Sequence, residues 1–176
     1  FVNGAFSATG GAVVTGPVHG SSVTLQSGTV LTLNGFVFDL LGDLTNHGTL
    51  TATVAGSRLS FGGTSAQTWS GGGGVTVPLH GLIVDNPAGG TVAAAPFTTL
   101  RANLLRGTLT GSDAITLGSG GATSAITQIG GGAANLTSPG GGYDLAPVFN
   151  AGTGGVQVLY QQESVARTTG VEIPSS

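Results

Sequence analysis

Seven carboxylates and three histidines are the side chains of this sequence that could carry acid–base or metal chemistry. A glycosidase or a calcium-assisted polysaccharide lyase needs two or three acids converging on one face. Asp39 and Asp43 are the closest pair, but Leu40-Leu41-Gly42 between them predicts a corner of the chain. The remaining acids are widely scattered: Asp85, Asp113, Asp144, Glu163 and Glu172.

These acids therefore predict no paired catalytic carboxylates, although a carbohydrate-active lyase or glycoside hydrolase stays open as an alternative function. Asp85 precedes Asn86-Pro87 and is explained as a turn residue. Structural calcium, bound by scattered aspartates and backbone carbonyls, is the one cofactor left open. The histidines, His19, His47 and His80, lack the close spacing of a zinc site.

The sequence lacks the residues that several other kinds of catalysis and ligand binding require. The chain contains no Lys and no Cys, which excludes Schiff-base and thiol catalysis. The glycine runs at Gly71–Gly74, Gly130–Gly132 and Gly140–Gly142 have no lysine to complete a phosphate-binding loop, so they are predicted to be turns. We therefore expect no enzyme activity, no catalytic residue and no organic cofactor.

Composition favours a folded β-protein. Only 6% of the 176 residues are charged and 34 are glycine, yet 39% are hydrophobic. Disordered chains have fewer hydrophobic and β-branched residues than this. The net charge of −3 with four arginines argues against nucleic acid as a partner. No run of about 18 apolar residues is present, which argues against membrane insertion.

Short alternating apolar patterns predict strands of three to six residues, each closed by Gly, Asn, Ser or Pro. Only residues 98–107 show helix-like spacing. Within residues 23–121 the alternation predicts which side chains point inward: Leu25, Leu33, Phe38, Leu50, Leu59, Phe61, Val84, Leu109 and Leu117.

The stretch GDLTNHGTL (42–50) returns in altered form as ANLLRGTLT (102–110). An alignment of the two places Leu44 on Leu104, with a one-residue slip, and Leu50 on Leu109, an offset of 59. Coils of roughly 20 residues would make this offset three turns of a solenoid. Asn46-His47-Gly48 is then a corner, with His47 at its exposed tip and Asn and Gly available for positive φ.

Threonines alternate along two segments. Thr49, Thr51 and Thr53 share one side of their run, as do Thr108 and Thr110. Flat threonine arrays on a solenoid would suit ice binding, which is a further alternative function. Threonine is also a preferred outward residue of ordinary strands.

Four segments in order resemble the repeat region of large secreted bacterial surface proteins of the Bacteroidetes type. They are GDLTNHGTL, SRLSFGGTSAQTWSG (57–71), HGLIVDNPAGGTV (80–92) and LLRGTLTGSDAITLGSGG (104–121). The resemblance implies a right-handed parallel β-helix, export and a surface or adhesive role, with no catalytic residue to carry over. Pro78 and His80 depart from the repeat, which has plain strand residues there.

We therefore expect one all-β solenoid domain with uncapped ends: an edge coil (1–22), repeat coils (23–121), and Gly-rich coils with C-terminal strands (122–176). The absence of Met is typical of a processed or excised chain. The expected function is that of a secreted, extracellular structural protein, a segment or subunit of a surface fibre or adhesin. Its partners would be copies of itself, stacked head to tail, and surface glycans. The residues expected to self-associate are Val156, Val158, Tyr160, Val171 and Ile173.

Overall fold

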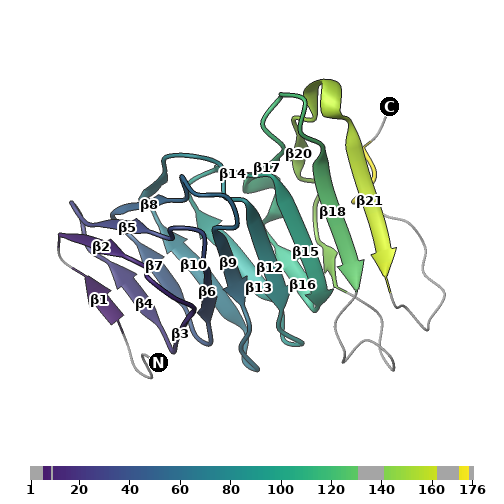
Figure 1. Ribbon diagram of the computed structural model, residues 1–176. Coiled ribbons are helices and arrows are strands. Elements are labelled where there is room, and N and C mark those ends of the chain that lie inside the picture. The colour runs from purple at the N-terminus through teal and green to yellow at the C-terminus, as the bar shows by residue number, and fades with distance from the viewer. Residues whose placement is uncertain (1–5, 9, 131–140, 162–170, 175–176) are drawn as a thin grey trace.

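The chain winds into a β-solenoid consistent with a parallel β-helix, in which successive coils stack their strands side by side (Figure 1). The computed structural model describes residues 6–8, 10–130, 141–161 and 171–174. Every strand pairing within these residues is parallel. The all-β, parallel fold expected from the sequence is confirmed.

Each coil supplies one strand to each of three sides. The first side is a seven-stranded sheet made of β1 (Phe6–Ala8), β4 (Val23–Leu25), β7 (Leu44–Asn46), β10 (Gln67–Gly71), β13 (Gly90–Ala94), β16 (Thr108–Thr110) and β19 (Gly142–Tyr143). The third side is a seven-stranded sheet made of β3 (Val18–Gly20), β6 (Val37–Leu40), β9 (Arg58–Phe61), β12 (Gly81–Asp85), β15 (Arg101–Arg106), β18 (Ala125–Gly130) and β21 (Val156–Gln161).

The second side is divided into two sheets. The first of them contains β2 (Gly11–Val13), β5 (Val30–Thr32), β8 (Thr49–Thr51) and β11 (Gly74–Val75), and the second contains β14 (Phe97–Thr99), β17 (Ile115–Leu117) and β20 (Val148–Phe149). Pro78 lies at the division, between β11 and an isolated bridge from Leu79 to Thr99. Proline has no N–H to donate to a ladder, which accounts for a break here. Two short 3-10 helices, η1 (Ser112–Ala114) and η3 (Gly152–Gly154), occupy corners.

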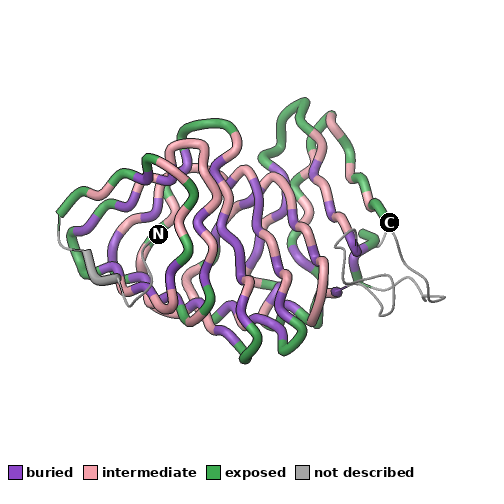
Figure 2. The backbone as a smooth tube through the Cα atoms, turned by 60° about the horizontal axis from the view of Figure 1, so that its bottom comes forward, coloured by how far each residue is buried: buried purple, intermediate pink, exposed green. Residues whose placement is uncertain are grey.

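Inward side chains stack into apolar ladders along the solenoid axis, and Figure 2 shows buried residues recurring along every coil. The nine positions predicted to point inward are all buried: Leu25, Leu33, Phe38, Leu50, Leu59, Phe61, Val84, Leu109 and Leu117. Trp69, also buried, lies with its ring centroid 4.4 Å from that of Phe97. Burial of these ladders supplies most of the driving force for folding.

The repeat alignment, in contrast, was wrong in register. Leu44 lies on the first side and Leu104 on the third, while Leu50 lies on the second side and Leu109 on the first. The true equivalents on the first side are Val23, Leu44, Trp69 and Val92, whose differences in residue number give coils of 21, 25 and 23 residues. Because the corners vary in length, the similar stretches at residues 42–50 and 102–110 lie on different sides of the solenoid. Residues 98–107, with their helix-like spacing, form parts of β14 and β15.

The corner at residues 46–48 lies where the sequence predicted it, but the reason for its glycine differs from the prediction. His47 is exposed at its tip, as predicted. Neither Asn46 nor Gly48 has a positive φ, so that part of the prediction was wrong. Glycine is required at position 48 because a Cβ there would lie 2.5 Å from the carbonyl oxygen of Thr29 in the preceding coil.

Buried amide side chains hold neighbouring corners together. Gln67 Nε2 donates to the carbonyl oxygens of Leu40 and Gly42 at 2.8 and 2.7 Å. Its Oε1 accepts a bond of 2.8 Å from Asn86 Nδ2 of the next coil. These bonds connect the corners of three successive coils and give the buried amide groups of Gln67 and Asn86 hydrogen-bond partners.

Candidate functional site

Several of the described carboxylates make structural contacts with residues of neighbouring coils. Asp39 accepts a bond of 2.9 Å from His19 Nδ1, and Asp43 accepts one of 2.8 Å from the Thr68 N–H. Asp85 forms an ion pair with Arg106. Within the described residues, no group of three or more His, Asp or Glu side chains comes together as a metal site would require. Glu163 lies outside the described residues.

Asp144 shows how a carboxylate can stabilise a corner. Partial desolvation acts to raise the pKa of its side chain, but hydrogen bonds from the Gly111 N–H and from Ser112 outweigh it, and the pKa is lowered. The charged form of Asp144 is therefore the one that fastens η1 to the following coil.

Of the predicted turns, the run Gly71–Gly74 makes the corner between β10 and β11. A Cβ on Gly73 would lie 2.4 Å from the Gly48 carbonyl oxygen, so packing between coils explains this glycine. The other two runs, 130–132 and 140–142, extend into residues 131–140, outside the described residues.

The two threonine runs do not form one array. Thr49 and Thr51 lie in β8 on the second side, whereas Thr108 and Thr110 lie in β16 on the first. Thr53 is exposed beyond the end of β8. A flat surface that joins the two runs is therefore absent from this part of the chain.

At the N-terminal end of the solenoid, the described residues leave an apolar cleft of about 380 Å³. Inward side chains of the first coils, Ala12, Val14 and Val18, line it together with Leu31 and Phe38 behind them. The cleft is thus the open end of the hydrophobic core.

The C-terminal end is built from β21. Val156 and Val158 continue the inward ladders of Ala125 and Thr127 and remain half-buried. Tyr160 continues the ladder of Ile129 and is 41% exposed. The outer edge of β21 has no strand partner among the described residues.

Val171 and Ile173 do not form the edge strand that the sequence led us to expect. Residues 171–174 form a turn and a bend, with both hydrophobic side chains exposed. Between them, Glu172 is buried and accepts a bond of 2.7 Å from the Tyr160 hydroxyl. This segment packs against part of the C-terminal end, so the end is less open than an uncapped coil would be.

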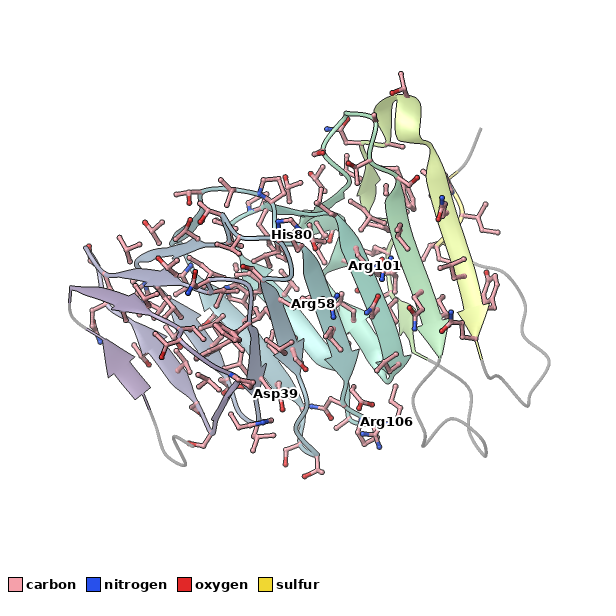
Figure 3. All side chains as sticks on the ribbon, in the orientation of Figure 1. Asp39, Arg58, His80, Arg101 and Arg106 are labelled. Carbon is pink, nitrogen blue, oxygen red and sulfur yellow. The ribbon has the colours of Figure 1, made fainter. Side chains whose placement is uncertain are left out.

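A basic groove on the third side was not predicted from the sequence. Arg58, His80 and Arg101 line a shallow depression of about 250 Å³ (Figure 3). The available signal was weak, because the coil lengths that bring Arg58 and Arg101 into one ladder vary and could not be assigned from the sequence.

Comparison of the chain with protein-family models, with curated proteins and with solved structures found no match. No helix in the described part of the chain is both long and apolar enough to cross a membrane.

Proposed function

We propose that this protein is an extracellular structural β-solenoid that associates with copies of itself, head to tail, in a surface fibre or adhesin. The observation that carries the proposal is that, among the described residues, each sheet ends at both ends of the solenoid axis in a strand with a strand neighbour on one side only. On the third side, β3 and β21 are the two outermost strands of the sheet, and on the second side β2 and β20 are the outermost strands.

Parallel strands favour this mode of assembly. A copy placed after β21 would add its own β3 to the same sheet, in the same direction, as the next rung. A contact between two different ends does not close on itself and so continues into a filament. Unpaired edge strands are known templates for such pairing.

Apolar surface is available at both ends. The cleft lined by Ala12, Val14 and Val18 lies at one end, and the half-buried Val156 and Val158 lie at the other. Pairing between copies would remove these side chains from water, as it does for each coil inside the solenoid. With a net charge of −3 over 176 residues, little electrostatic repulsion opposes association.

The extracellular part of the proposal rests on the resemblance to repeats of secreted surface proteins. A surface low in charge and rich in Thr, Ser and Gly agrees with a passive structural role. Tyr160, Val171 and Ile173 belong to the same exposed end and are included among the contact residues.

Single substitutions at one end test the proposal. Val158→Lys places a charge on the inward ladder of β21 and should reduce association, since edge lysines oppose strand addition. Leu41→Lys is the matched control, because Leu41 is 46% exposed at a corner between β6 and β7, away from β21. Circular dichroism would establish that both variants fold. Equal loss of association in both variants would contradict association through the ends and indicate general apolar adhesion.

A further inference from the structure

The basic groove lies on the lateral face of the third side, where the strands begin. Arg58 is the first residue of β9 and Arg101 is the first residue of β15. His80 immediately precedes β12, which lies between those two strands. Figure 3 shows the three side chains together, with Asp39 and Arg106 toward the opposite border of the sheet.

Strand register places the two arginines in one outward ladder. Gly81 pairs with Arg58, and Leu82 pairs with Ala102, so Arg101 is the neighbour of Gly81 on its other side. Two strand steps separate the arginine backbones, about 10 Å. The ladder thus presents two guanidinium groups along the solenoid axis, with a glycine between them.

Gly81 makes room for the side chain of Arg58. A Cβ on Gly81 would lie 3.3 Å from Arg58 Cγ, 3.5 Å from Cδ and 3.7 Å from Nε. The stem of Arg58 therefore lies across Gly81, in the direction of Arg101. Any larger residue at position 81 would occupy that path.

Neither guanidinium is neutralised by a described residue. Within the described residues, the side chains of Arg58, His80 and Arg101 make no hydrogen bond and no ion pair, whereas Arg106 is paired with Asp85. Arg58 Nε is buried and lacks a hydrogen-bond partner. No described carboxylate lines the groove. Two of the four arginines of an acidic protein therefore line one groove with no counter-charge from the part of the chain that the structure describes.

We propose that this groove binds carboxylate or sulfate groups of a linear acidic polysaccharide. The planar guanidinium fork matches the geometry of such oxyanions, and two forks along one axis suit a polymer that repeats its charge. Leu100 and Ile126 supply apolar surface for the C–H face of a sugar ring. Nucleic acid fits less well, because two arginines neutralise too few phosphates to give appreciable affinity.

This inference goes beyond the proposed self-association and does not depend on it. The groove extends across β9, β12, β15 and the start of β18, and neither terminal strand of the third side, β3 or β21, lines it. A head-to-tail fibre would leave the groove exposed and would carry one groove per copy. Several weak contacts with one polysaccharide chain would then give a higher overall affinity than a single contact.

Isothermal titration with an oligogalacturonate tests the site, with its carboxyl-reduced neutral counterpart and free sulfate as comparison ligands. We expect binding of the oligogalacturonate, none of the neutral sugar, and weakening as salt is raised. Arg58→Gln and Arg101→Gln should each weaken binding about tenfold or more, the loss expected for one charge-assisted contact. Arg106→Gln, a paired arginine on the same sheet, should leave the affinity within about twofold.

Three results would overturn the proposal: no binding of the oligogalacturonate, equal binding of the neutral sugar, or equal losses for Arg106→Gln and Arg58→Gln. Free sulfate binding as tightly as the oligomer would also overturn it, because the site would then recognise a small anion. Sedimentation of the same samples reports self-association separately, so failure of the glycan site and failure of head-to-tail assembly can be distinguished.

Discussion

The Tyr160 hydroxyl donates a hydrogen bond of 2.7 Å to Glu172 Oε1, which joins the last strand of the solenoid to the turn at residues 171–174. Glu172 is only 5% exposed, and its charge also acts on Tyr143. The C-terminal turn is thus tied to the end of the core through a buried carboxyl group.

Tyr160→Phe removes that bond while preserving the ring. Because a buried acceptor then loses a donor, we expect the free energy of unfolding to fall by about 1–3 kcal/mol, measured by urea denaturation. Leu159→Thr, a change at an exposed position of the same strand, is the control. Full retention of stability in Tyr160→Phe would mean that the turn is not fastened to β21 through this contact.

The assignment of inside and outside is tested at Leu50 and His47, three residues apart. Leu50 is fully buried, so Leu50→Ala should cost about 2–5 kcal/mol in the free energy of unfolding, and Leu109→Ala the same. His47 is exposed at a corner, so His47→Ala should cost less than about 0.5 kcal/mol. The reverse order in thermal or chemical denaturation would show that the coil is turned inside out.

Gly48→Ala tests the close approach of successive coils. The new methyl group would lie 2.5 Å from the Thr29 carbonyl oxygen and 2.8 Å from that of Gln26, so the backbone must shift. We expect a loss of about 1–3 kcal/mol. Gly72 has open space around the corresponding position, and Gly72→Ala should change stability by less than about 0.5 kcal/mol. Equal effects in denaturant melts would contradict the stacking distance at this corner.

Alkaline pH should destabilise the protein through Tyr143. Burial raises the pKa of the Tyr143 phenol well above its usual 10.0, and the charge of Glu172 raises it further. The hydrogen bond between Tyr143 and Thr127 lowers the pKa, but by less than burial raises it. The unfolded chain releases that proton above about pH 10 while the folded chain keeps it, so stability is intact below pH 10 and falls above it.

The expected slope is up to about 1.4 kcal/mol per pH unit. Chemical denaturation between about pH 8 and pH 11 measures it, undisturbed by Lys or Cys, which the chain lacks. Tyr143→Phe should flatten the fall. An unchanged slope in that variant would show that Tyr143 is not the buried phenol.

Much of the fold follows from local pattern, and the inward residues show why. Alternation at Leu31 and Leu33, or at Leu59 and Phe61, has a period of two whatever the strand pairs with, so burial could be predicted without knowing the topology. The register between strands could not be predicted in this way, because it depends on the lengths of the corners. The coils that begin at Val23, Leu44 and Trp69 differ in length, and the apparent repeat crossed from one side to another.

The surface features were harder to predict for the same reason. Arg58 and Arg101 become neighbours only through the register of β9, β12 and β15, and Gly81 acquires its role only beside Arg58. Likewise, Asn46, Gln67 and Asn86 have polar side chains, which are mostly exposed in proteins, yet all three are buried. Their burial depends on backbone groups of adjacent coils, which local sequence does not specify.

Head-to-tail association through the solenoid ends can be measured by sedimentation and electron microscopy of the purified chain. Over rising protein concentration we expect a shift to larger species and unbranched filaments as wide as one solenoid. Deletion of residues 171–176, which removes Val171, Ile173 and the Glu172 contact at the C-terminal end, should alter this association. An intact chain that stays monomeric at high concentration would contradict head-to-tail association.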